Sequence, residues 1–324
     1  MKRFTLVLFV IAALGTAATA QTTVSISDFQ SAVATFAADM ASVLDANSTT
    51  GNVWSSAYVG GFPKFGVGLS VGANFIPADS LTAFEDLGIA IPAELKQYGI
   101  PIPAAVASLK IGLPFLPIDV GVKGGLIPDA ASGALSGMGV DLTYHTLGVN
   151  VRYAILKDKL LIPAVSVGAS WNYVKGSAKA GLGTGGYDYT YGTYTIAVTD
   201  PDMALEWESN TFDFTLQVSK DLLIFTPYAG AGLTVGKSTV KAGMSAATSI
   251  TDNGTLVSAE VVEAATGLEI DDQGFLETAE STTPVFRVYG GTSINIVFFR
   301  LDMMACYVPS AESFGAQVMA RVQL

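Results

Sequence analysis

The last eleven residues of the chain alternate between apolar side chains and small or polar ones. The apolar positions are Phe314, Ala316, Val318, Ala320, Val322 and Leu324, and Met319 is the exception among the others. A β-strand points successive side chains to opposite faces, so a period of two predicts a strand with two unlike faces. Such a strand suits a membrane barrel, in which one face meets lipid and the other meets a wet lumen.

The same alternation recurs along the chain in segments of strand length. These segments are residues 64–75, 106–113, 118–127, 143–155, 161–173, 211–219, 225–236, 285–295, 299–308 and 314–324. The tally is about ten, an even number as in bacterial single-chain barrels, and eight or twelve strands would also fit. The pattern predicts an all-β fold, a transmembrane antiparallel up-and-down β-barrel over residues 62–324.

The connections between these segments alternate in length. Short links lie near Phe115, Asp158, Asp221 and Val297, and long links cover residues 77–105, 128–142, 175–209 and 237–283. Outer-membrane barrels have short periplasmic turns and longer external loops, so the C-terminus is expected on the periplasmic side. A soluble secreted β-sandwich is the alternative fold. It requires polar outward faces, whereas the outward faces here are apolar.

A helical pattern precedes the first strand. Phe29, Val33, Phe36, Met40 and Val43 are spaced four, three, four and three residues apart, which predicts an amphipathic helix over about residues 27–46. Because this helix comes before the first strand, we expect it either to plug the lumen from the periplasmic side or to pack beneath the barrel. Residues 21–61 would then form a periplasmic or plug helix and its linker.

The terminal strand resembles the C-terminal assembly signal of bacterial outer-membrane proteins, which has apolar residues at alternate positions. The chain departs from that family at its last residue, where Leu324 stands in place of the usual aromatic side chain. The aromatic and glycine-rich segment 62–75 is similar to the first strand of spirochaete-type barrels. The resemblance implies a porin-like outer-membrane protein with two partners, the lipid of the outer membrane and the barrel-assembly machinery.

The first twenty residues predict export. Lys2 and Arg3 precede an apolar run over residues 4–14, and a small-residue triplet ends at Ala20, which is the pattern of a cleavable secretory signal peptide. The run is shorter than the roughly 20 apolar residues that a membrane-spanning helix requires. The expected location is therefore the bacterial outer membrane.

Charge and rare residues narrow the function. The net charge is −11, and removal of residues 1–20, which contain two basic and no acidic side chains, lowers it to −13. Such acidity argues against nucleic acid as a partner. With Cys306 the only cysteine and His145 the only histidine, neither a Cys/His zinc cluster nor another cofactor site is expected.

His145 is the one candidate for acid–base catalysis. Its parity with Leu147 and Val149 places it on the outward face, and Thr143 and Thr146 provide no nucleophile and orienting partner in the arrangement that catalysis needs. We therefore expect an interfacial structural histidine, no catalytic residue and no enzyme activity.

Parity also predicts a group of charged side chains inside the barrel. This group comprises Lys64, Lys110, Arg152, Arg300, Arg321 and Asp302. A ring of basic side chains would favour anions in an open pore. The alternative is a plug latch, in which these residues pair with wall aspartates (Asp119, Asp213 and Asp302) or with helix aspartates (Asp28, Asp39 and Asp45). The latch is favoured because charges in a narrow barrel usually pair.

The first long link is unusually apolar for an external loop. Its apolar side chains include Phe84, Leu87, Ile91, Leu95 and Tyr98. These residues could form an apolar gate that admits apolar ligands, or they could pack on one another over the barrel mouth.

These observations favour a passive channel or uptake pathway for a small solute of unknown identity, with apolar solutes included. The alternative is a non-conducting structural or adhesive surface barrel, and a helix that fills the lumen would favour it. The discriminating measurement is the conductance of the folded protein in a bilayer.

Overall fold

The structure is a computed structural model that describes residues 26–86, 91, 93–126, 140–181, 187–191, 193–198, 202–245, 248–258, 261 and 275–324. The predicted signal peptide and Leu87 of the expected apolar gate lie outside the described residues.

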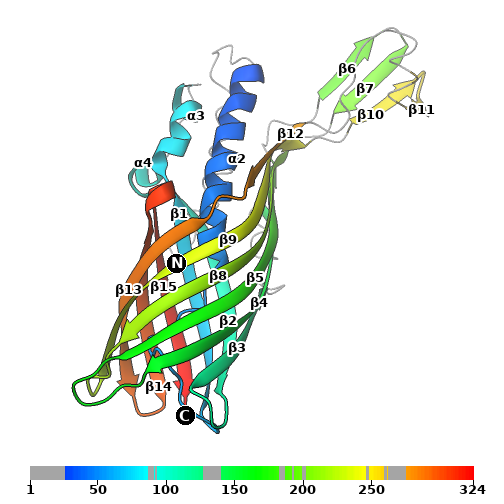
Figure 1. The fold of residues 1–324 in the computed structure, drawn as a ribbon. Coiled ribbons are helices and arrows are strands. Elements are labelled where there is room, and N and C mark those ends of the chain that lie inside the picture. Colours follow the sequence, from blue (N-terminus) through cyan, green and yellow to red (C-terminus); the bar gives the residue numbers. More distant parts are fainter. Residues whose placement is uncertain are drawn as a thin grey trace.

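Ten strands form a closed antiparallel barrel (Figure 1). They are β1 (Phe65–Ile76), β2 (Ile100–Gly112), β3 (Ile118–Leu126), β4 (Val140–Leu156), β5 (Ala164–Gly181), β8 (Asp202–Ser219), β9 (Phe225–Ser245), β13 (Val285–Ile296), β14 (Phe299–Val308) and β15 (Ser313–Gln323). Each strand pairs with the next, and β15 pairs with β1 in an unbroken register from Gly66 opposite Gln323 to Asn74 opposite Gly315. The predicted all-β, ten-stranded up-and-down barrel is confirmed.

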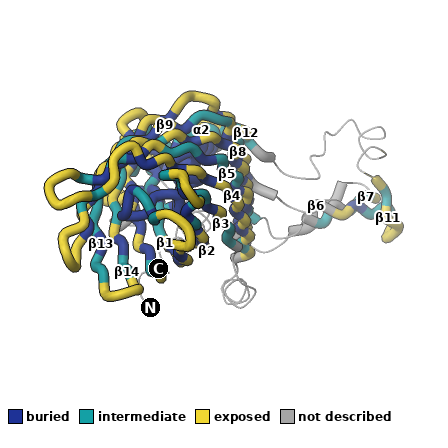
Figure 2. Tube along the Cα trace, turned by 60° about the horizontal axis from the view of Figure 1, so that its bottom comes forward, coloured by how far each residue is buried: buried dark blue, intermediate teal, exposed yellow. Residues whose placement is uncertain are grey.

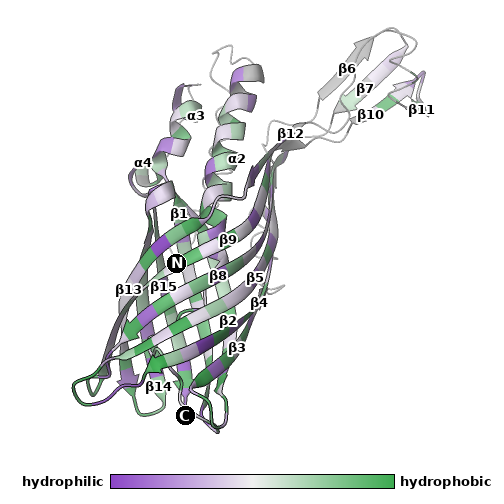
Figure 3. Ribbon diagram, in the orientation of Figure 1, coloured by the Kyte–Doolittle hydropathy of each residue, from purple (hydrophilic) through white to green (hydrophobic). Residues whose placement is uncertain are grey.

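The outer face of the barrel is apolar and exposed. Leu69 and Val71 on β1 are 66% and 58% exposed, whereas their neighbour Ser70 is 1% exposed. Hydrophobic positions recur along the barrel strands in Figure 3. A continuous apolar exterior of this kind is the lipid-facing belt of an outer-membrane-type barrel. A soluble β-sandwich has the opposite arrangement, with polar side chains on its outer faces. Within the described part of the chain, no helix has the length and hydropathy needed to cross a membrane.

Several strands extend further than the alternation predicts. β5, β8 and β9 run on beyond the belt at the end with the long links, and β12 (Phe275–Ser281) pairs with the far part of β9. Much of the expected loops 175–209 and 237–283 is therefore strand. The extension is stable because its inward side chains, including Val174, Trp207 and Val240, are buried against a helix. A separate four-stranded sheet has the order β11 (Thr255–Val257), β10 (Thr248–Asp252), β7 (Tyr194–Val198), β6 (Tyr187–Tyr191).

The link between β1 and β2 contains short helices. They are η2 (Ala78–Leu81), α3 (Thr82–Asp86) and α4 (Ala93–Tyr98). A further short helix, η3 (Pro309–Ala311), lies in the link between β14 and β15. β2 begins at Ile100, six residues earlier than expected, because Ile100, Ile102 and Ala104 continue the inward alternation of the strand.

The predicted amphipathic helix is α2 (Ile26–Ser48), but it lies at the end of the barrel opposite to the one expected. Its C-terminal part enters the lumen between the long links, while the short turns and the C-terminus lie at the other end (Figure 1). The chain then descends inside the ring of strands and reaches β1 at the short-turn end; Figure 2 shows buried chain within the ring. The expectation of a helix at the short-turn end is thus corrected, because the apolar inner surface that buries α2 is provided by the extended strands at the long-link end. The side of the membrane on which this end lies stays a prediction.

Candidate functional site

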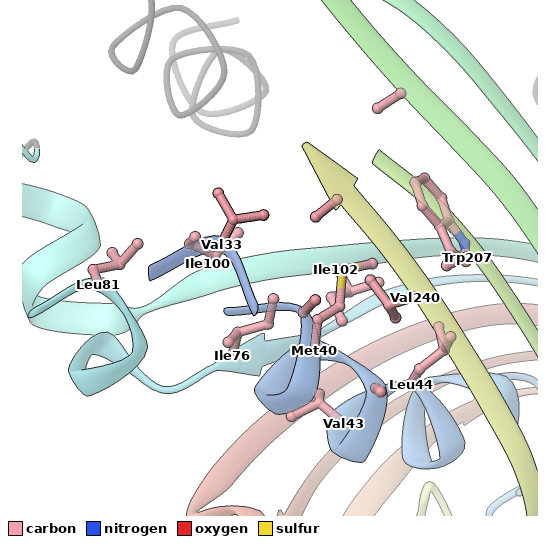
Figure 4. Packing of buried hydrophobic residues seen from close by; sticks show 14 of the residues in the cluster. Val33, Met40, Val43, Leu44, Ile76, Leu81, Ile100, Ile102, Trp207 and Val240 are labelled. Carbon is pink, nitrogen blue, oxygen red and sulfur yellow. The ribbon is translucent and has the colours of Figure 1, made fainter. Parts of the chain in front are cut away.

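α2 is anchored at the mouth of the barrel by an apolar cluster. Val33, Met40, Val43 and Leu44 of the helix pack with Ile76, Ile100, Ile102, Trp207 and Val240 of the strands (Figure 4). Outside the mouth, the ring of Phe36 meets the ring of Phe84 edge to face at 6.3 Å between centroids. Burial of this many aliphatic side chains fixes α2 in one position, since each contributes on the order of 1.5–3 kcal/mol.

Residues 47–59, which begin with the last two residues of α2, occupy the lumen, and we refer to them as the lumen segment. Its sequence, NSTTGNVWSSAYV, is small and polar apart from a few side chains. All of its residues except Tyr58 are buried, and Trp54 is completely so. Small polar residues suit this position because the inner wall is polar, and a buried backbone needs hydrogen-bond partners.

Hydrogen bonds to one strand trace the descent of the lumen segment. Ser48 Oγ lies 2.9 Å from Thr211 Oγ1 near the upper part of β8. Gln217 Nε2 donates to Trp54 O at 2.7 Å, and Ala57 N donates to Ser219 Oγ at 2.9 Å at the lower end of β8. On β5, Ser170 and Asn172 accept hydrogen bonds from Asn52 Nδ2 at 2.8 and 2.9 Å. The segment therefore runs the length of the lumen in contact with the wall.

Three buried ion pairs line the wall around the segment. They are Arg152–Asp119 at 2.8 Å, Arg287–Asp213 at 2.6 Å and Arg321–Asp302 at 2.8 Å. Two of them also hold the lumen segment directly. Asp119 accepts a hydrogen bond from Val59 N at 3.0 Å, and Asp302 accepts hydrogen bonds from Ser55 N at 3.2 Å and Ser55 Oγ at 3.0 Å.

The remaining basic residues of the predicted lumen group divide into two cases. Lys110 donates to Asn52 O at 2.6 Å and lies 5.4 Å from the centre of the Trp54 ring, and Arg300 donates to Ser56 Oγ at 2.8 Å. Lys64 does not point into the lumen. It is exposed at the short-turn end, because it precedes β1 in a turn in which its N–H bonds to Gly61 O. Five of the six predicted residues therefore contact the lumen segment or the pairs that hold it.

The contacts have the form of a latch, and two of the predicted basic residues, Arg152 and Arg321, pair with wall aspartates as the latch prediction includes. The carboxylates come from the wall, and many wall cations bind main-chain carbonyls of the segment, as Arg152 does with Ser56 O at 2.8 Å. Two further basic residues of the lumen wall, Arg287 and Lys123, are not among the six residues of the predicted group. The alternation of side chains identifies the inward faces of β13 and β3, which carry Arg287 and Lys123. No sequence signal shows that inward cations would contact carbonyl oxygens of residues 47–59.

The expected apolar gate is a packed cap and not an opening. Phe84, Ile91 and Leu95 are buried in the cluster around α2, whereas Tyr98 is 60% exposed. Apolar side chains of this link therefore close the mouth by packing on the helix, which is the self-packing alternative.

Asp45, at the mouth, is a buried carboxyl whose side-chain partners among the described residues are serines and not cations. It is 0% exposed and accepts hydrogen bonds from Ser238 and, at 3.5 Å, from Ser209, while Oδ2 has no partner among the described groups. Burial raises the pKa of this α2 side chain to about 6, against the lowering effect of the two serines. The ionised form is therefore disfavoured in the folded protein.

We expect Asp45→Asn to stabilise the protein at pH 7 by about 2–3 kcal/mol. A raised pKa means that the folded state holds the proton more tightly than the unfolded state, so stability falls as pH rises from about 4 to about 6. The measurement is the free energy of unfolding of both proteins as a function of pH. Their difference should grow over this interval, and a difference that is constant from pH 4 to pH 7 would contradict the assignment.

No catalytic arrangement accompanies His145 in the part of the chain that the structure describes. The residue is exposed on the outer face of β4, as its parity predicts. A search of the described residues finds no group of three His, Cys, Asp or Glu side chains that could hold a metal ion.

Comparison with known proteins gives a family. A family model described as a family of unknown function (DUF6588) matches residues 102–308. No curated protein matches the sequence significantly. Similar solved structures include the outer membrane protease OmpT from Escherichia coli, with 9% identity, coverage of 81% of this chain and 97% of that chain, and a TM-score of 0.37. The translocator domain of the autotransporter NalP from Neisseria meningitidis has 7% identity, coverage of 80% and 87%, and a TM-score of 0.33. A FadL homologue from Pseudomonas aeruginosa has 8% identity, coverage of 81% and 90%, and a TM-score of 0.26.

Proposed function

We propose that this chain, which belongs to the DUF6588 family of unknown function, is an outer-membrane barrel whose passage for small solutes is closed at rest by its own lumen segment. The observation that carries the proposal is the continuous burial of residues 43–57 inside the closed ring of strands. A polar wall around a polar segment also supports it, because water and small solutes can replace hydrogen bonds that the segment now makes.

The location in the bacterial outer membrane, export by the predicted signal peptide, and the lipid and assembly-machinery partners are part of the same proposal. The apolar belt on the outer face supports lipid contact, and the apolar alternation of β15 supports recognition during assembly. The proposal contains no catalytic step.

The test is to lock the lumen segment to the wall. Ala57 and Ser219 are adjacent, since Ala57 N lies 2.9 Å from Ser219 Oγ, so cysteines at both positions should form a disulfide in a Cys306→Ser background. In planar bilayers we expect occasional openings of the reduced protein, loss of openings after oxidation, and recovery with a reducing agent. The single variant Ala57→Cys, which has no partner thiol in this background, is the control, and its openings should not change when the oxidant is added.

A second function is favoured by the external architecture. β5, β8, β9 and β12 continue beyond the belt, and a further four-stranded sheet is built from the long links, which is the arrangement of a barrel that displays a rigid surface. This is the non-conducting structural or adhesive alternative, which the filling of the lumen by α2 and the lumen segment also favours. A folded barrel that is silent both oxidised and reduced would reject the closed passage and favour this function; equal currents in both states would show that current does not follow the lumen.

A further inference from the structure

Two buried ammonium groups on the lumen wall have no carboxylate to neutralise them. The described parts of the barrel strands bury five basic and three acidic side chains. The basic ones are Lys110, Lys123, Arg152, Arg287 and Arg321, and the acidic ones are Asp119, Asp213 and Asp302. Each aspartate is paired with an arginine, so the two lysines are the surplus. A wall with excess positive charge in a chain of net charge −11 is a local feature, not a consequence of composition.

Both lysines converge on one short stretch of the lumen segment. Lys110 Nζ donates to Asn52 O at 2.6 Å, and Lys123 Nζ donates to Ser48 O at 2.6 Å and to Thr50 O at 2.9 Å. Lys110 is 0% and Lys123 2% exposed. A carbonyl oxygen satisfies a hydrogen bond but carries no full charge, and the nearby carboxylates Asp119 and Asp213 are each already paired with an arginine. The mutual repulsion of the two buried ammonium groups is therefore only partly compensated.

Two glycines of the neighbouring strands leave room for the aliphatic parts of the two lysine side chains against the wall. A Cβ at Gly121 would lie 2.8 Å from Lys110 Cγ and 2.8 Å from Asn150 Oδ1, so the stem of Lys110 and the amide of Asn150 meet over this glycine. A Cβ at Gly148 would lie 2.6 Å from Lys123 Cε. A larger residue at either position would displace these side chains, so the glycines define the cluster.

Two neutral polar groups beside the lysines have unused hydrogen-bonding capacity. Asn150 is 8% exposed, and neither its Nδ2 nor its Oδ1 has a hydrogen-bond partner among the described groups. Ser108, which is opposite Lys123 in the pairing of β2 with β3, is 4% exposed, and its Oγ is likewise unpartnered in the described structure. Buried amides and hydroxyls are nearly always satisfied, and a ligand that accepts hydrogen bonds would satisfy Asn150 Nδ2 and Ser108 Oγ.

We propose that Lys110, Lys123, Asn150 and Ser108 form a binding site for a small inorganic anion beneath the lumen segment. The ammonium groups supply the charge, and the amide N–H and hydroxyl groups supply further donors, which together make a donor-rich site that excludes cations. The anion neutralises the surplus lysines and so stabilises the same residues that hold the carbonyl oxygens of Ser48, Thr50 and Asn52. The site goes beyond the proposed passage and does not depend on conduction.

The test uses the full chain folded in detergent, with chloride as the probe. Replacing gluconate by chloride at constant ionic strength should raise the unfolding temperature by about 3 °C at a tenfold excess over the dissociation constant. Asn150→Leu, which keeps the branching at Cγ and removes the donors, and Lys110→Met should both lose this shift. Lys175→Met, at an exposed position of β5, is the matched control and should retain it.

Bromide gives the direct measurement. In crystals grown with bromide, an anomalous peak is expected within hydrogen-bond distance of both lysine Nζ atoms and of Asn150 Nδ2. The proposal is overturned if the native protein shows no chloride shift, if Asn150→Leu shows the same shift as the native protein, or if the bromide peaks lie at the protein surface, which would indicate an adventitious ion only.

Discussion

Replacing Asp302 with leucine is expected to reduce the free energy of unfolding by about 3–5 kcal/mol and to release the lumen segment. Asp302 is the shared acceptor of Arg321, at 2.8 Å, and of Ser55 in the segment. Its loss leaves Arg321 buried without a counter-charge, which is the costly way to break an ion pair. Ser55 loses two hydrogen bonds at the same time. Chemical denaturation gives the first quantity, and the rate at which a thiol reagent modifies Ala57→Cys, in the Cys306→Ser background, gives the second.

Asp213→Leu is the matched control for this prediction. Asp213 is equally buried, but its partners, Arg287 and Thr234, are both on barrel strands. We expect a similar loss of stability with little change in the labelling rate at position 57. Equal labelling rates in the two variants would mean that general loosening, and not the contact with Ser55, exposes the segment. In the double variant Asp302→Leu/Arg321→Met, most of the stability should return, because removing both charges leaves neither member of this pair buried without its partner, while the labelling should stay fast.

The alternation of side chains was sufficient to predict the barrel because lipid acts on every strand in the same way. Leu147, Val149 and Val151 are exposed on one face of β4, and Asn150 and Arg152 are buried on the other, as parity requires. A substitution that broke the alternation would place a polar group in lipid or an apolar one in the lumen. The closure of β15 on β1 also follows, since a barrel has no free edge.

Other features depended on contacts that no local pattern encodes. α2 reads as amphipathic in sequence, but the end of the barrel at which it lies depends on where Trp207 and Val240 provide an apolar inner surface above the belt. Lys64 has inward parity, yet it falls in the turn before the strand begins, where parity no longer determines direction. Hydrogen bonds between Lys123 and the carbonyls of residues 48 and 50 join positions more than seventy residues apart, and sequence spacing cannot reveal them.

A cysteine at Thr35 is expected to react with a membrane-impermeant maleimide in intact cells. Thr35 is exposed on the part of α2 that projects beyond the barrel mouth, at the end with the long links. Short turns are periplasmic in outer-membrane barrels, so the opposite end, and with it this half of α2, faces the outside. The chain would then enter its own lumen from the cell surface and leave it at the periplasmic end. Cys306→Ser removes the only native thiol from this experiment.

Leu160→Cys supplies the control, because Leu160 is 92% exposed in the short link between β4 and β5. It should react only after the outer membrane is made permeable, whereas Thr35→Cys should react equally before and after. The reverse pattern would place α2 in the periplasm and restore the orientation that chain order alone suggests. Failure of Thr35→Cys to react in either condition would show that the exposed half of α2 is covered, and it would reject the projecting helix. Because Thr35 and Leu160 lie at opposite ends of the barrel, the one that reacts before the outer membrane is made permeable identifies the end that faces the cell surface.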